Sequence, residues 1–258
     1  MTSTTYIFEQ PLNERIRIFL RIEALVQRLS YFNAQDNDHS SYHSLLTILE
    51  ITSLVERGDI KQEVIKELER QNKVLNALMS HQNVDKPRLE LTLSKIKNSL
   101  GNMHAMDGKL GEHLKRIDFL LTIKQRASIP GGSCDFDLTQ LRYWLNRAYA
   151  ERLQDINHWS EPYFKIHEVI ELLLRLIRDS ALATVVTAHK GFFQQNLDTS
   201  LSNQLLRIEL DAEDYVFPEI SAGKHRYSIR FLQSQENFDR IPVQLKQDVN
   251  FKLYLCAL

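Results

Sequence analysis

Cys134 is the residue of this 258-residue sequence whose type and setting most suggest catalysis. It follows Gly131 and Gly132 in "IPGGSCDFDL", and a nucleophilic thiolate there would need an activating histidine or a helix N-terminus. Asp137 lies three residues further on, and its negative charge disfavours a thiolate nearby. The glycine pair therefore predicts a structural turn, and a thiol-dependent enzyme centred on Cys134 remains the alternative.

His167 begins the stretch "HEVIE", which resembles the first part of a zinc-hydrolase motif. Glu171 stands where the second histidine ligand should be, so a metal-dependent enzyme centred on His167 also remains only an alternative. His39 and His43 lie in "NAQDNDHSSYH", which favours a polar loop and a helix start over a metal site. Neither "GxxxxGK[ST]" nor "GxGxxG" is present. We therefore expect no catalytic residue, no cofactor, no metal and no enzymatic activity.

A second kind of chemistry, recognition of an acidic partner, is indicated by the basic residues of "GKHRYSIRF". Alternate residues of a β-strand project from one face, so this stretch predicts a cationic ladder made by Lys224, Arg226 and Arg230. The three cations are expected to stand about 7 Å and 13 Å apart along the strand. The opposite face would carry the apolar anchors Tyr227, Ile229 and Phe231. An extended peptide with carboxylates suits this spacing.

A basic stripe is also predicted on the first helix, where Arg17, Arg21 and Arg28 fall within about 40° at 100° per residue. A nucleic-acid adaptor that uses these arginines is a third hypothesis. The near balance of 32 Lys and Arg against 33 Asp and Glu argues against it, because no global field draws the chain to nucleic acid.

The elements that must position these residues change period along the chain. Residues 12 to about 180 show helical spacing, whereas "TVVTAHKGFF", "NQLLRIELDAED", "KHRYSIRFLQSQ" and "VNFKLYLCAL" alternate as strands do. We predict an α+β protein with an N-terminal all-helical domain at 10–182 and a C-terminal antiparallel β domain at 183–258. Residues 3–9, "STTYIFE", are expected to add a strand.

Helix boundaries are predicted from capping residues and breakers. Asn13, Asp59, Asp85, Asp137 and Ser160 are the expected start signals, the last with Pro162 in the first turn. Gly58 is expected to adopt a left-handed conformation after a helix over 40–57, and one helix is expected over 109–127.

The cysteine content suits a reducing compartment. Two cysteines give no disulfide framework, no signal-peptide pattern opens the sequence, and no apolar run reaches the 18 residues of a membrane span. We therefore expect a cytoplasmic protein that inserts in no membrane.

Taken together, several stretches resemble the ZapD family of Z-ring-associated bacterial cell-division proteins. The resemblance covers essentially the whole chain and is carried by "FEQPLNERIRIFLRIEAL", "ERGDIKQEVIKELERQ", "VDKPRLE", "QRASIPGGSCDFDLTQLRYWL", "GFFQ" and "FPEISAGKHRYSIRF". It implies a non-enzymatic homodimer that binds the C-terminal tail of the tubulin-like GTPase FtsZ. It further implies that the dimer cross-links FtsZ filaments into bundles, promotes Z-ring assembly and stability, and is recruited to mid-cell at the division ring.

The resemblance also implies partner-binding residues. Basic family positions map onto Arg21, Arg226 and Arg230, and Arg142 stands where the family has a histidine. A basic family position near residue 118 is Asp118 here, with Arg116 close before it. The complete set expected to contact partners is Lys224, Arg226, Arg230, Arg21, Arg17, Arg142 and Arg116.

Overall fold

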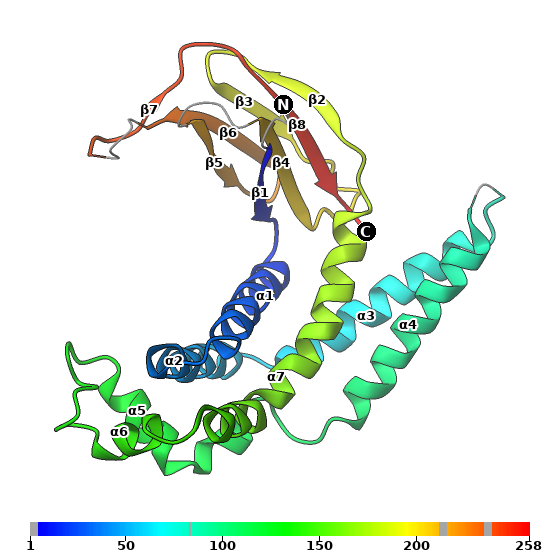
Figure 1. The fold of residues 1–258 in the computed structure, drawn as a ribbon. Helices are drawn as coiled ribbons and strands as arrows, with labels where there is room; N and C mark the ends of the chain where they lie inside the picture. Colours follow the sequence, from blue (N-terminus) through cyan, green and yellow to red (C-terminus); the bar gives the residue numbers. More distant parts are fainter. Residues whose placement is uncertain (1–4, 83, 212–215, 235–238) are drawn as a thin grey trace. The chain divides into compact units, whose positions relative to one another are not determined.

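The computed structural model describes residues 5–82, 84–211, 216–234 and 239–258, and it shows an α+β protein (Figure 1). Its helices are α1 (Glu14–Asn33), α2 (Asp38–Val55), α3 (Ile60–Leu78), α4 (Lys86–Ala105), the 3₁₀ helix η1 (Glu112–Arg116), α5 (Asp118–Arg126), α6 (Thr139–Leu145) and α7 (Tyr149–Arg178). Its strands are β1 (Thr5–Pro11), β2 (Thr184–Ala188), β3 (Phe192–Asn196), β4 (Leu205–Asp211), β5 (Val216–Ala222), β6 (Arg226–Gln233), β7 (Val243–Gln244) and β8 (Val249–Cys256). The predicted fold class is confirmed.

The chain divides into two compact units. The helical unit is Ile18–Leu173, and the β unit joins the chain up to Arg17 with Leu174–Leu258. In the β unit, one antiparallel sheet has the order β1-β4-β8-β2 and the other has the order β3-β6-β5, with β7 also on β6. One cluster of buried side chains from both sheets, including Ile208, Phe231 and Phe251, forms the core. The unit is therefore a β-sandwich.

The N-terminal strand belongs to the β unit. β1 pairs antiparallel with β4, from Thr5 opposite Asp211 to Pro11 opposite Leu205. The expected strand at residues 3–9 is thus found in the part that the structure describes, and residues 3 and 4 lie outside it. Glu9 on β1 receives two hydrogen bonds from Arg178, at 2.9 and 2.8 Å.

Side-chain caps confirm several predicted helix starts. Asn13 Oδ1 accepts a hydrogen bond from the amide of Ile16 at 3.0 Å, in the first turn of α1. Asp59 and Asp85 accept from amides three residues on, each at 3.1 Å, at the starts of α3 and α4. Each cap satisfies an amide that has no partner within its own helix.

The predicted break at Ser160 is wrong, because α7 continues through Pro162. Ser160 is buried and donates to the carbonyl of Ile156 at 2.7 Å instead of capping a new helix. Trp159 and Tyr163 are buried on either side of the proline. This packing outweighs the local cost of a proline in a helix, where it lacks an N–H and crowds the preceding turn.

Three further boundary predictions are wrong. The helix expected over 109–127 is split into η1 and α5 at Ile117, whose ψ of 95° is not helical. Asp137 does not cap α6, which begins at Thr139 behind Leu138, and it lies 3.5 Å from Arg126 instead. Gly58 is not left-handed.

The glycine pair forms the predicted structural turn. Gly131 has φ of +72°, and a Cβ on Gly132 would lie 2.5 Å from the carbonyl oxygen of Arg126. The amide of Gly132 donates to the carbonyl of Ile129 at 2.9 Å. Backbone meets backbone here, so glycine is required for close approach rather than for chemistry.

We expect Gly132→Ala to lower the free energy of unfolding of the helical unit by about 2 to 3 kcal/mol, because the new methyl group must displace backbone. Gly101→Ala is the matched control. Gly101 lies within α4, and a Cβ added there would meet no atom within 4 Å beyond the backbone of its own helix, so the substitution should stabilise by about 0.5 to 1 kcal/mol. Thermal denaturation followed by tryptophan fluorescence measures both. Equal stability of the two variants would contradict the close approach at Gly132.

Candidate partner-binding surface

Along strand β6, residues exposed on one side of the sheet alternate with residues buried in the core on the other. Tyr227, Ile229 and Phe231 are 1%, 0% and 0% exposed and form part of the β-unit core, as predicted. Arg226 and Arg230 are exposed on the opposite side of the strand. The strand thus holds its two cations on a scaffold of buried aromatic and aliphatic side chains.

Lys224 does not belong to this ladder. The strand begins at Arg226, and Lys224 lies with His225 in the turn that follows β5. The amide of Gly223 donates to the carbonyl of Arg226 at 2.9 Å across this turn. Lys224 is therefore an exposed cation at the end of the hairpin. The prediction that all three cations stand on one face of one strand is wrong.

The strands beside β6 contribute to the same side of the sheet. On β3, the residue opposite Arg226 is Asn196, the residue opposite Ser228 is Gln194, and the residue opposite Arg230 is Phe192. On β5, Ser221 lies opposite Ser228 and Glu219 lies opposite Arg230. We call these eight residues the β6 outer face. It combines two guanidinium groups with amide and hydroxyl groups and with the ring of Phe192, which is 39% exposed.

The arginines of this face remain available to a ligand. Glu219 is the register partner of Arg230, yet among the described residues no carboxylate lies within 4.0 Å of the guanidinium of Arg226 or Arg230. Behind them, burial raises the pKa of Tyr227 to about 12, so this phenol stays protonated. Its hydroxyl donates to Gln195 Oε1 at 2.8 Å, which holds β3 against β6.

Both outer strands of this sheet offer an edge. Within the described part of the chain, β6 is the one strand with which β3 and β5 pair, and Phe192 at the start of β3 also forms an isolated bridge with His189. Unpaired amides and carbonyls on an edge strand can accept an added peptide strand. An extended acidic peptide could therefore combine edge pairing with contacts to the arginines.

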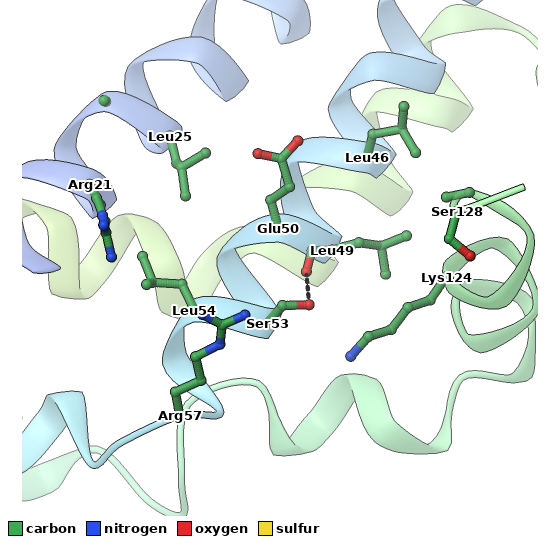
Figure 2. Close-up of a pocket in the computed structure, with 12 residues that line it drawn as sticks. Arg21, Leu25, Leu46, Leu49, Glu50, Ser53, Leu54, Arg57, Lys124 and Ser128 are labelled. Carbon is green, nitrogen blue, oxygen red and sulfur yellow. Dashed lines mark hydrogen bonds between the residues drawn. The ribbon is translucent and has the colours of Figure 1, made fainter. Parts of the chain in front are cut away.

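The cations predicted on the helices differ from those of β6, because several of them form ion pairs. Arg17 pairs with Glu14 at 3.1 Å, and Arg142 on α6 lies 3.5 Å from Asp135. Arg116 is exposed at the end of η1. Arg21 is exposed on α1 and borders a pocket in the helical unit (Figure 2). The expected stripe on the first helix is thus partly neutralised, since Arg28 also binds a carboxylate, Glu50, at 2.5 Å.

The candidate catalytic residues lack partners for chemistry in the described chain. Cys134 is exposed in the glycine turn, and His167 has its Nε2 atom buried without a hydrogen-bond partner. Among the described residues, no group of three or more His, Cys, Asp or Glu side chains is placed to hold a metal ion. His43 stacks on Phe32 with ring centroids 5.0 Å apart, which gives it a packing role.

The two cysteines should differ sharply in reactivity. Cys256 is buried, and burial raises the pKa of its thiol to about 11, so it stays protonated near neutral pH. Cys134 is exposed. We expect iodoacetamide at pH 8 to label Cys134 in the folded protein and Cys256 only after unfolding, as peptide mass spectrometry would show. Rapid labelling of Cys256 in the folded state would contradict its burial.

Sequence reasoning missed part of this surface. The β3 and β5 residues join β6 through pairings that the local pattern does not encode, and β5 itself interrupts its alternation with Pro218. The stretch "GFFQQN" carried a signal, because Phe192 and Phe193 project to opposite sides of one strand. Phe193 packs on Phe251 inside the sandwich, with the two ring centroids 5.6 Å apart, whereas Phe192 lies on the outer side of the sheet.

Fold and surface together define an α+β protein of two units, with exposed arginines on one face of its β unit. A family model described as "ZapD: Cell division protein" matches residues 20–230. A cell division protein ZapD of Methylococcus capsulatus is 37% identical over 252 residues, 98% of each chain. Another, of Chromobacterium violaceum, is 38% identical over 249 residues, 96% of this chain and 98% of the relative.

The chain therefore belongs to the ZapD family of cell division proteins, as the motifs of the sequence indicated. A role in cell division follows from this membership. Among the described residues, no helix combines the length and apolar character needed to cross a membrane.

Proposed function

We propose that this protein is a non-enzymatic scaffold that binds the C-terminal tail of FtsZ through the β6 outer face. The observation that carries the proposal is the pair of exposed arginines, Arg226 and Arg230, free of carboxylate partners in the described chain and flanked by open strand edges. Lys224 adds a third cation at the end of the hairpin. Family membership supports the cell-division setting.

We further propose that a homodimer cross-links FtsZ filaments into bundles and so promotes Z-ring assembly and stability. Two-fold symmetry presents each tail site twice. Once one tail is bound, the effective concentration for the second contact reaches roughly the millimolar scale, so weak individual sites suffice. Weak sites also let bundles dissolve when the ring is remodelled. On this proposal the protein acts in the cytoplasm and is recruited to mid-cell by the filaments themselves.

The helical cations have a separate place in the proposal. Arg21 and Arg116 are exposed, and Arg142 holds only a long contact to an exposed aspartate. We assign these three residues to contacts made with filaments after the tails are bound. Arg17 is a weaker candidate, because its guanidinium already binds Glu14.

Co-sedimentation with GTP-assembled FtsZ tests the proposal. The protein should pellet with filaments of intact FtsZ and stay in the supernatant with FtsZ that lacks its C-terminal tail. Light scattering should give twice the chain mass of 30.2 kDa at micromolar concentration. Equal pelleting with both filaments would place the contact on the FtsZ body, and a monomer that still bundles filaments would refute the two-fold bridge.

A further inference from the structure

A small pocket of about 270 Å³ lies in the helical unit beside the turn that joins α2 to α3. The segment that leads into η1 forms its other wall. This volume is just below the roughly 300 to 1,000 Å³ of sites that hold drug-sized ligands, so the pocket suits a smaller molecule. Its charged lining residues are Glu56, Arg57, Asp59, Lys61, Lys109 and Lys115.

Close packing fixes the two walls of this pocket relative to each other. Val55 at the end of α2 and Ile60 at the start of α3 belong to the lining and are only 4% and 3% exposed. On the other wall, Gly111 follows the lining residue Leu110 and has φ of +80°; a Cβ on Gly111 would lie 3.1 Å from the hydroxyl oxygen of Tyr163. This close approach holds the segment before η1 against α7, so the pocket is a preformed feature of the fold.

Four cations gather in this pocket. We call them the pocket cations: Arg57, Lys61, Lys109 and Lys115. Within the part of the chain that the structure describes, no carboxylate lies within 4.0 Å of any of the four. Lys61 is half-buried, and its ammonium group donates a hydrogen bond to the carbonyl oxygen of Met106. Like charges repel one another in a shared pocket, so an anion placed among them would stabilise the folded chain.

The two carboxylates that border the pocket already have other partners. Glu56 binds Lys124 Nζ at 3.1 Å. Asp59 accepts a hydrogen bond from the amide of Gln62 at 3.1 Å and so caps α3. An incoming anion therefore displaces no existing ion pair of the pocket cations. Because the cap already occupies the start of α3, side-chain cations rather than the helix terminus make this site.

This arrangement favours phosphate over other anions. A phosphate group carries a charge of about −1.5 to −2 at neutral pH and presents three acceptor oxygens, whereas a carboxylate carries one charge on two oxygens. Arginine binds phosphate through two parallel N–H···O hydrogen bonds, and lysine binds it as a point charge. The residues that line the pocket include no aromatic side chain on which a nucleobase could stack. The group that the pocket recognises is therefore the phosphate itself.

We infer that this pocket binds the phosphate groups of a small ligand, which lie among the four pocket cations. The inference goes beyond FtsZ-tail binding and does not rest on it, because none of the lining residues belongs to the β6 outer face. A bound phosphate joins the α2–α3 turn to the segment before η1. Phosphate binding therefore stabilises the helical unit by mass action.

Inorganic diphosphate is the probe, and citrate at equal ionic strength is the control anion. Calorimetry should detect diphosphate binding to the unmodified protein, and citrate should bind at least about tenfold more weakly, since it offers carboxylates alone. At a hundredfold excess over Kd, diphosphate should raise the midpoint of thermal unfolding by at least about 4 °C, as measured by tryptophan fluorescence. Both tryptophans lie in the helical unit, so their fluorescence reports on it. Absence of diphosphate binding, or equal binding of citrate, would overturn the inference.

A pair of lysine variants places the probe in the pocket. Lys109→Gln with Lys115→Gln removes two exposed cations and should weaken diphosphate binding at least about tenfold. Lys95→Gln with Lys97→Gln on α4 removes the same charge from exposed positions outside the lining and should change affinity less than about twofold. Circular dichroism should be the same for both variants. Unchanged binding by the pocket variant, or equal loss in the α4 variant, would overturn the inference.

Gly58 allows a second test that leaves every cation in place. A Cβ on Gly58 would meet no atom within 4 Å, and its φ is not positive, so a side chain is accommodated at this lining position. Gly58→Asp adds a negative charge and should weaken diphosphate binding at least about tenfold, whereas Gly58→Asn, of the same size without the charge, should change it less than about threefold. Equal affinities of these two variants would contradict the site.

A nucleoside diphosphate distinguishes the two sources of such phosphate groups. Tighter binding of GDP than of inorganic diphosphate, lost in Lys109→Gln with Lys115→Gln, would support the site and identify a nucleotide as its ligand. Weaker binding of GDP would support the site and identify a free phosphate anion. GDP binding that the lysine variant does not weaken, together with no binding of diphosphate, would place nucleotide recognition elsewhere and overturn the inference.

Discussion

Replacing Arg226 and Arg230 together by glutamate is expected to abolish measurable binding of an FtsZ C-terminal tail peptide in calorimetry. Each arginine is partly exposed and contributes roughly 0.2 to 1 kcal/mol, so one loss should weaken binding only modestly. Charge reversal does more because repulsion replaces attraction at two points of one strand face. Circular dichroism and the mass measured by light scattering should stay unchanged, since both side chains lie outside the core.

Two further variants sharpen this experiment. Arg240→Glu with Lys246→Glu makes the same change of charge at exposed positions of the β unit outside β6, and it should leave affinity within about twofold. Glu219→Gln removes the carboxylate opposite Arg230 and should tighten binding slightly. Near-normal affinity of the double β6 variant at moderate salt would place the tail site elsewhere.

Removal of Glu9 should cause a large loss of stability in the β unit. Its carboxylate receives hydrogen bonds from Arg178 at 2.9 and 2.8 Å, and Arg207 Nε lies 2.9 Å from Oε1. The three side chains are only 19 to 22% exposed. Glu9→Ala leaves two half-buried guanidinium groups facing each other, at a cost of roughly 2 to 3 kcal/mol after allowance for the water that still reaches them.

Hydrogen exchange followed by mass spectrometry is the suitable measurement. Both tryptophans, Trp144 and Trp159, lie in the helical unit, so their fluorescence does not report directly on β1. Amides of β1 and β4 should exchange about 30- to 150-fold faster in Glu9→Ala. Glu14→Ala, which loses the exposed pair with Arg17, is the control and should cost less than about 1 kcal/mol. Unchanged exchange in β1 would contradict the role given to Glu9.

Local sequence signals predicted those parts of the fold that short-range physics decides. The caps at Asp59 and Asp85 depend on amides three residues away, and the alternation of β6 depends on its own pleat. Ser160 and Pro162 carried an equally clear local signal for a break, which failed because burial of α7 on both sides outweighs it. Where a local sequence signal failed, contacts with distant parts of the chain determined the structure instead.

The candidate surfaces show the same division. Arg226 and Arg230 were predictable from one strand, but their neighbours Gln194 and Glu219 come from strands whose pairing only the tertiary fold establishes. The pocket between α1, α2 and α5 was equally hidden, because its lining residues come from three separate helices.

Photo-cross-linking from the β6 outer face tests the central claim most directly. A photoreactive amino acid at Gln194, an exposed residue of β3 opposite Ser228, should cross-link to the FtsZ tail peptide, and the tail should be recovered on β3 and β6 fragments by mass spectrometry. The same group at Lys66, exposed on α3, serves as the background control. Cross-linking at Gln194 well above Lys66, lost with Arg226→Glu and Arg230→Glu, is the predicted result. A yield at Gln194 no greater than at Lys66, from a peptide that calorimetry shows to be bound, would contradict the account.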